Sequence, residues 1–331
     1  MTQPASTAWQ ERIAPGEDQA YERAADTLTA IQAQRSAKFG PGRGLHRKQL
    51  LAAQGTLTVR SGLPAFAAHG LFAQAAEWPV WVRVSNGGMD RAPDKMPDIR
   101  GFALRVQGVS GESALGGETA THQDFLFINQ EVFAFPQSAE FVDFVAAASQ
   151  GNGALLRHLI ARYGVLGGLG RLKRLLATVG KKFAGFAHEP LFTAAPQACG
   201  PYAIKLRLVP AGDHGPADPQ AAKDWGEDLA RRLRGGTTLH WELQVQPFVD
   251  EKTTPIEDAS VAWASPFVTV ADLTLPPQDV SSPEGKAFAD RVEKSVFDPW
   301  QALAAHRPLG DVQRARKVVY YRSQQNRQAQ G

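Results

Sequence analysis

Two residues one helical turn apart, Arg316 and Tyr320, form the pair in this sequence that is best suited to metal chemistry. Positions i and i+4 share one face of a helix, so the guanidinium can reach the phenol oxygen. A free phenol has a pKa of about 10 and binds metals poorly at neutral pH. A nearby cation and a ferric iron would hold it as phenolate, an axial ligand that some haem proteins use. Taken alone, the pattern better fits a basic amphipathic helix with an exposed Arg and a packed Tyr, and the adjacent Tyr321 competes for the role of ligand.

A second set of polar residues lies in the first half of the chain, in glycine-rich or strand-like surroundings. His46 follows Arg43 in a glycine-rich loop, and Asn129 follows a strand pattern beside aromatic residues. Arg83 and Ser85 stand two apart in an apolar strand pattern, so their side chains point to the same side. A buried Arg requires an anion and a buried Ser requires a partner. Taken singly, each of these residues is better explained by a structural role than by a functional one.

Together, these residues resemble the haem catalases and their smaller catalase-related relatives, which lack the C-terminal helical domain of full catalases. The motifs that carry the resemblance are Arg43-Gly-Leu-His46, Trp81-Val-Arg83-Val-Ser85, Asp98-Ile-Arg-Gly-Phe-Ala103, Asn129 with Phe133, and Arg316-x-x-x-Tyr320 with Arg327. The resemblance covers about 43–145 and 298–327, and it is loose between those stretches. It implies an α+β fold, in which an antiparallel β-barrel with flanking helices encloses haem b.

The resemblance also implies which residues would contact the cofactor. Tyr320 would be the iron ligand and Arg316 would tune it. The propionates would pair with three guanidiniums, and one aromatic ring would pack on the haem; these residues are Arg43, Arg83, Arg327 and Phe141. Bidentate pairing with carboxylates suits Arg better than Lys.

On the substrate side, the resemblance implies a catalase or peroxidase that acts on hydrogen peroxide or small organic peroxides. His46 would move a proton between the two peroxide oxygens, Ser85 would orient the imidazole, and Asn129 would bind the peroxide. Two alternatives stay open. The protein could convert fatty-acid hydroperoxides, as allene oxide synthases do, or it could bind haem without catalysis.

The whole chain fits one β-rich unit. Its 331 residues carry 43% hydrophobic residues and a net charge of only +3, too small a bias to indicate a nucleic-acid partner. There is one cysteine, Cys199, and the N-terminus lacks the apolar core of a signal peptide, so we expect a cytoplasmic protein. We expect an N-terminal arm and helix over 1–38 and one catalase-like domain over 39–331, and a homo-oligomer stays open.

Alternation and β-forming residues predict strands at 55–59, 79–85, 99–106, 124–128, 202–209, 239–248 and 268–274. Helices are predicted within 11–36, at 141–148, at 224–234, around Phe288 and Val292, and over the segment with Tyr320. Residues 153–186 differ, since they are apolar and carry seven Lys or Arg and no acidic residue. Their glycines predict two helices, which form either a solvated basic face over a buried one or a segment that contacts anionic lipid or an acylated substrate.

Overall fold

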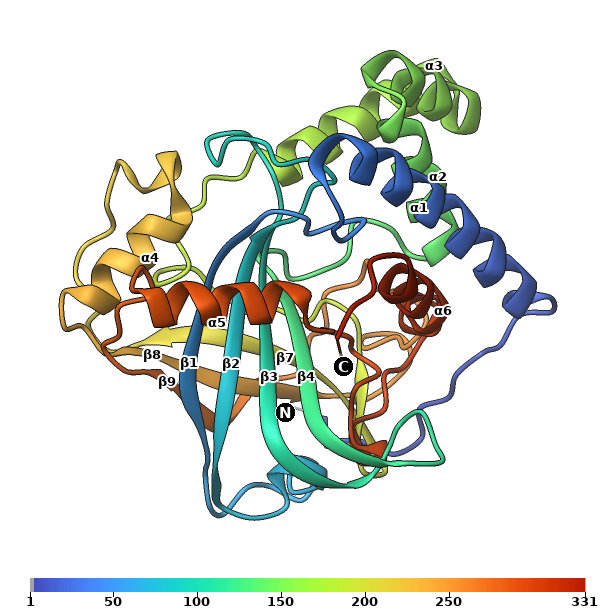
Figure 1. Ribbon diagram of the computed structural model, residues 1–331. Helices are drawn as coiled ribbons and strands as arrows, with labels where there is room; N and C mark the ends of the chain where they lie inside the picture. The colour runs from blue at the N-terminus through green and yellow to red at the C-terminus, as the bar shows by residue number, and fades with distance from the viewer. Residues whose placement is uncertain (1–2, 331) are drawn as a thin grey trace.

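The computed structural model describes residues 3–330 and contains a closed antiparallel β-barrel with helices packed on its outside (Figure 1). Eight strands form the ring in the order β5-β4-β3-β2-β1-β9-β8-β7, and pairing of β5 with β7 closes it, while β6 extends β7. The strands are β1 (Gln49–Val59), β2 (Ala76–Asn86), β3 (Arg100–Glu112), β4 (Thr119–Ile128), β5 (Leu191–Phe192), β6 (Gln197–Cys199), β7 (Tyr202–Ala211), β8 (Leu239–Pro247) and β9 (Val268–Leu275). The expected α+β barrel is therefore confirmed.

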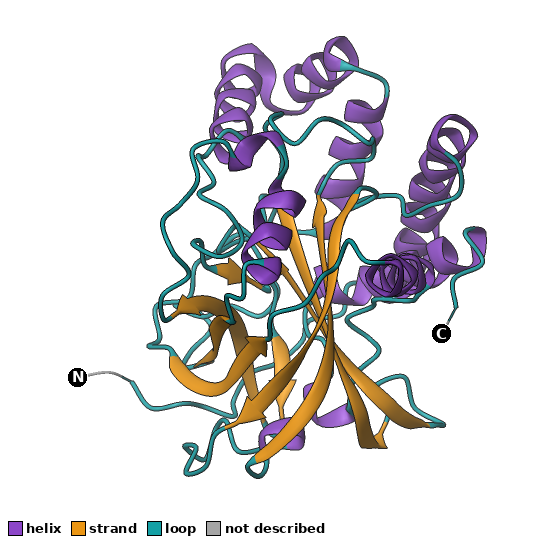
Figure 2. Ribbon diagram, turned by 60° about the vertical axis from the view of Figure 1, so that its left-hand side comes forward, coloured by secondary structure: helices purple, strands orange, loops and turns teal. Residues whose placement is uncertain are grey.

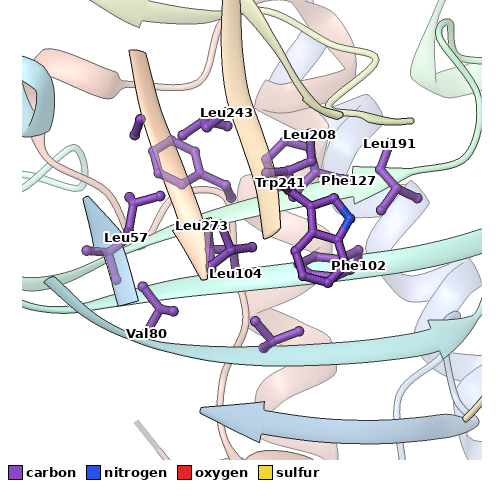
Figure 3. Packing of buried hydrophobic residues seen from close by; sticks show 14 of the residues in the cluster. Leu57, Val80, Phe102, Leu104, Phe127, Leu191, Leu208, Trp241, Leu243 and Leu273 are labelled. Atoms are coloured by element: carbon purple, nitrogen blue, oxygen red, sulfur yellow. The ribbon is translucent and has the colours of Figure 1, made fainter. Parts of the chain in front are cut away.

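Apolar side chains fill the inside of the barrel. Residues of one strand alternate between the two faces of a sheet, and here the inward positions of neighbouring strands meet in register: Val82 lies opposite Leu104, and Val84 lies opposite Phe102. Figure 3 shows these layers meeting side chains from β8, among them the fully buried Trp241. A barrel of eight strands has an interior just wide enough for such a core. The chemistry must therefore lie outside the ring.

In the described part of the chain six α-helices surround the barrel: α1 (Glu17–Phe39), α2 (Ser138–Ser149), α3 (Asn152–Val179), α4 (Trp225–Arg234), α5 (Pro283–Lys294) and α6 (Asp311–Asn326). Helix α5 crosses the outside of β1 to β4, and α6 lies beside it (Figure 1). Helices α1, α2 and α3 continue the helical layer beyond the sheet (Figure 2). Among residues 3–330 no helix combines the length and the hydropathy needed to cross a membrane.

Arg314 fixes α6 against the start of the chain. Its guanidinium donates to Glu17 at 2.6 Å, to Glu11 at 2.8 Å and to Glu257 at 3.0 Å. All four side chains are largely buried, with exposed fractions between 8% and 18%. One side chain thus joins the N-terminal arm, α1, a loop and α6, the helix that carries Tyr320.

The predicted elements are found with altered boundaries. Strand β1 begins at Gln49, six residues before the predicted strand, and the short strands β5 and β6 were not predicted. Of the glycines expected to divide residues 153–186, only Gly164 leaves the helical conformation, with φ 72°. Gly168 then packs closely on the backbone of Leu159, so the chain folds back on itself after the kink.

Candidate active site

A large cavity lies between the outer face of β2 to β4 and the helices α1, α2 and α6. The space between its atoms is about 1580 Å³, including its opening to solvent. Residues from the barrel and from all three helices line this one space, so a ligand bound in it would contact both layers of the fold.

Outward-facing positions of the barrel form one wall of this cavity. Arg83 and Ser85 alternate with the inward-facing Val82 and Val84, as the i, i+2 spacing predicted. The residues opposite them on β3 are small: Ala103 pairs with Arg83, and Gly101 pairs with Ser85. All four line the cavity. The small side chains on β3 leave room in front of the polar ones on β2.

His46 stands at the edge of this wall in a strained and tightly held conformation. Its φ of 50° places a non-glycine residue in the left-handed region, which costs roughly 1–2 kcal/mol. The backbone is held from both sides, since His46 N donates to Gly87 O at 3.0 Å and Arg83 Nη2 donates to His46 O at 2.9 Å. Nδ1 lies 3.1 Å from Ser85 Oγ. In the described part of the chain Nε2 has no hydrogen-bond partner, so it is available to a ligand.

The surroundings of His46 keep its imidazole neutral. Burial lowers the pKa of His46 to about 3, and the positive charges of Arg83, Arg316 and Arg43 add to the effect. Gly101 packs against the ring, and a Cβ there would lie 2.6 Å from His46 Cε1 and 2.8 Å from Ser85 Oγ. Glycine at 101 is therefore required for the observed imidazole position.

Helix α6 supplies the phenol on the helical side of the cavity. Arg316 Nη2 donates to Tyr320 Oη at 2.8 Å, and Arg316 Nη1 donates to Gln313 Oε1 at 3.0 Å. Both Arg316 and Tyr320 line the cavity, whereas Tyr321 is 60% exposed on the other face of the helix. The structure thus separates the two adjacent tyrosines, and only Tyr320 faces the cavity.

Three arginines from distant parts of the chain meet at the end of α5. Arg43 donates to the Glu293 carboxylate at 3.0 Å and to Ser295 O at 2.8 Å. Arg83 donates to the same carboxylate at 2.9 Å, and Arg327 donates to Ser295 O at 2.8 Å. All three arginines line the cavity. Cations near a helix C-terminus are favoured by its unpaired carbonyls.

This arginine cluster, formed by Arg43, Arg83 and Arg327 around Glu293, carries more positive than negative charge. Three guanidiniums face one carboxylate, which leaves an excess of two positive charges. Burial and the like charges of Arg83 and Arg327 lower the pKa of Arg43, and burial lowers the pKa of Arg327 to about 10. Like charges held in a buried site favour an anionic ligand. The excess matches a ligand with two carboxylates.

Of the two remaining predicted site residues, Phe141 lines the cavity and Asn129 does not. Phe141 lines the cavity from α2 and stacks edge-on against Phe133, with ring centroids 4.8 Å apart. The side-chain Oδ1 of Asn129 accepts a hydrogen bond from the backbone N–H of Arg100 at 2.8 Å. The backbone N–H of Asn129 donates to Arg100 O. The structure gives Asn129 a role in holding the start of β3, and its role in peroxide binding stays a prediction.

Two features of the site were not predicted from the sequence. Glu293 is one of many charged residues in α5, and no sequence pattern near it indicates that it pairs with Arg43 and Arg83. Gln324, one turn after Tyr320, donates to the buried Asp298 at 2.6 Å. Burial raises the pKa of Asp298 to about 6. The i, i+4 spacing of Tyr320 and Gln324 was a usable signal for the second feature, because it places both on one helix face.

Comparison with known proteins supports the fold and not the sequence motifs. No protein-family model matches this sequence, and no curated protein matches it. Solved structures do match. A fungal catalase aligns with a TM-score of 0.68 and 16% identity over 90% of this chain and 62% of its own. A bacterial catalase aligns with a TM-score of 0.64 and 18% identity over 99% and 64%.

A third match is catalase A from Saccharomyces cerevisiae, with a TM-score of 0.65 and 16% identity over 92% of this chain and 64% of its own. The chain thus spans less than two thirds of the length of the catalases it matches. At these identities the likeness extends to the fold. The chain has the barrel-and-helix fold of the catalases.

Proposed function

We propose that this protein is a haem-dependent enzyme that acts on hydrogen peroxide or small organic peroxides, as a catalase or a peroxidase. One observation carries the proposal: a neutral imidazole, an arginine-bound phenol and a dicationic arginine cluster line the same cavity. These groups come from three separate regions of the chain. The catalase fold supports the proposal.

The cavity residues fit haem b. The arginine cluster would bind its two propionates, because its excess of two positive charges complements two carboxylates. Phe141 would pack on the ring, and Tyr320 Oη would be the iron ligand, held in place by Arg316. Haem, when bound, supplies the iron at which a peroxide is reduced.

His46 provides the proton transfer that cleavage of a peroxide bond requires. Its pKa of about 3 leaves the imidazole neutral at physiological pH, so Nε2 can accept a proton from one peroxide oxygen and return it to the other. Ser85 holds Nδ1 at 3.1 Å and thereby fixes the ring plane.

The ligand assignment is tested by absorption spectra of the haem-loaded wild type, Tyr320→Phe and Tyr321→Phe. We expect Tyr320→Phe to change the spectrum or to lose haem, because it removes the oxygen that Arg316 holds at 2.8 Å. Tyr321→Phe is the matched control, and because its side chain is 60% exposed the spectrum should not change. An unchanged spectrum in Tyr320→Phe would rule out Tyr320 as the ligand.

The proton-transfer assignment is tested with His46→Ala. General acid–base groups typically contribute about 10²–10⁴-fold, so we expect peroxide turnover to fall by that factor while haem binding and its spectrum are retained. Ser85→Ala should lower turnover less, because the imidazole remains. Wild-type turnover by the loaded His46→Ala protein would refute the assignment.

A second function, conversion of fatty-acid hydroperoxides, is favoured by the apolar part of the cavity. Helices α1, α2 and α6 contribute Leu28, Ile31, Val142, Val145 and Val312 to the lining. An apolar wall of this kind can accommodate an acyl chain, whereas a small polar peroxide does not require it. Oxygen release from hydrogen peroxide and loss of a lipid hydroperoxide separate the two functions. A loaded protein with neither activity would be a haem-binding protein without catalysis.

A further inference from the structure

Large exposed hydrophobic residues are concentrated on α3, mainly near the point where this helix folds back on itself. Of the eight large hydrophobic residues that are exposed in residues 3–330, four lie in α3: Val165 at 60%, Leu166 at 87%, Leu169 at 47% and Leu176 at 59%. Three of them directly follow the kink at Gly164. Because Gly168 returns to the backbone of Leu159, Val165 and Leu166 stand at the apex of the turn. Figure 1 shows α3 projecting from the body of the molecule, away from the barrel.

The inner side of α3 is already occupied. Leu159 and Leu175, one from each arm of the folded helix, pack together with Phe135 in a core of their own. The exposed apolar residues therefore do not belong to the packed face of α3. They are additional to a face that is buried, and an exposed apolar patch of this kind marks a contact surface.

The segment that contains α3 is strongly basic along its length. The segment 153–186 has seven Lys and Arg residues and no acidic residue. The chain as a whole has 36 basic and 33 acidic residues, so the rest of it has 29 against 33 and a net charge of −4. Arg162 and Arg171 have acidic partners on α2, at 3.6 Å and 3.5 Å. The other five form no ion pair among the described residues and are exposed: Arg157, Lys173, Arg174, Lys181 and Lys182.

We propose that the folded α3 helix docks the protein onto an anionic lipid surface. Val165 and Leu166 at the apex would insert into the headgroup region, and the five exposed cations of the same segment would face the lipid phosphates. A helix with apolar residues and basic flanks, and no acidic residue, is suited to this location. The proposal does not depend on haem or on catalysis. Helix α3 packs on α2, which lines the cavity, so docking would bring the cavity close to the membrane.

Sedimentation with vesicles tests the proposal. The full chain is mixed with vesicles of phosphatidylcholine alone and with vesicles that also contain phosphatidylglycerol, at low and at high salt. We expect binding to the anionic vesicles only, and loss of binding at high salt because surface charges are screened. Absence of binding to the anionic vesicles would overturn the proposal.

Two double variants identify the surface. Lys173→Gln with Arg174→Gln should weaken binding about 30-fold, at roughly fivefold for each cation near the membrane. Leu166→Ser with Leu169→Ser should weaken it at least about tenfold through lost apolar burial. The matched controls are Lys286→Gln with Arg291→Gln, exposed on α5, and Leu115→Ser, 46% exposed between β3 and β4.

Unchanged vesicle binding in both double variants would overturn the proposal, because the bound surface would then lie elsewhere. Light scattering provides the second arm of the test. If the chain forms a dimer that Leu166→Ser with Leu169→Ser dissociates, and the wild type does not bind anionic vesicles, the apex is instead the contact between two copies of the chain.

Discussion

At the residue scale, Glu293 is the internal counterion of the arginine cluster. We expect Glu293→Gln to lower the free energy of unfolding of the haem-free protein, because it leaves three guanidiniums without an anion. Removing one partner of a buried pair costs about 3–5 kcal/mol, and the 26% exposure of Glu293 reduces this to about 1–3 kcal/mol. Urea unfolding of haem-free protein measures the loss.

Haem loading provides the control for this variant. If the propionates supply replacement negative charge, the deficit of Glu293→Gln should shrink once haem is bound. Asp290→Asn, exposed on the same helix, should have little effect in either form. A deficit of equal size with and without haem would show that the cluster does not bind the propionates.

The expected pH dependence of peroxide turnover follows from the pKa of one residue, His46. Because the pKa of His46 is lowered from 6.5 to about 3, the imidazole stays neutral throughout the range from about pH 5 to pH 8. We therefore expect no loss of peroxide turnover on crossing pH 6.5 in the acid direction. The same shift affects folding: below about pH 6.5 the unfolded chain binds a proton at His46 and the folded chain does not, so stability falls as pH falls toward 3.

Turnover of the loaded wild type, measured in steps across that range, checks the first part of this prediction. A limb with its midpoint near pH 6.5 would mean that the imidazole titrates normally, and that its burial against Gly101 and Ser85 is not maintained in the loaded protein.

At the element scale, Arg314 positions α6. We expect Arg314→Met to lower the free energy of unfolding by about 3–5 kcal/mol, because it leaves Glu11, Glu17 and Glu257 facing each other in a buried site. Arg322→Met is the matched control on the same helix. Arg322 pairs with Glu22 and Asp26 of α1, but its side chain is 41% exposed, so its loss should cost about 0–1 kcal/mol.

Acid should remove the difference between wild type and Arg314→Met. The hydrogen bond from Arg314 lowers the pKa of Glu17 below its ordinary value of 4.5. The stabilisation is therefore complete above that value and is lost as the pH falls through the lowered pKa. Chemical denaturation at neutral pH and at decreasing pH below 4.5 checks this. A constant difference would show that the contacts of Arg314 act by packing alone.

Contacts within one helix or strand could be predicted from the sequence, whereas contacts between elements could not. Alternation predicted that Arg83 and Ser85 share a face, and the helical period predicted that Arg316 reaches Tyr320, because both rules act within one element. Glu293 was missed because its partners come from other elements, at sequence separations of 250 and 210 residues. The choice of Gly164 as the kink was equally inaccessible, since it depends on how Gly168 packs on Leu159.

At the scale of the whole molecule, the catalase resemblance predicted the barrel correctly, although no family model matches the sequence. The reason is physical: a closed antiparallel barrel needs only apolar alternation and turns, so its strands tolerate extensive substitution. The site tolerates less, because hydrogen-bond geometry fixes each polar residue. Most predicted site residues therefore line one cavity, while Asn129, predicted from spacing to an aromatic residue, does not.

The cavity is walled by both the first and the last described helices, α1 and α6, and this has a consequence during synthesis. The last strand of the barrel ends at Leu275, whereas α6 ends at Asn326. A ribosome adding about 5–20 residues per second completes the ring several seconds before it completes α6. During that interval the nascent chain exposes Arg83 and His46 without Tyr320. If the cavity binds haem as we propose, loading would follow translation of α6, and we expect a chain interrupted before Arg316 not to retain haem.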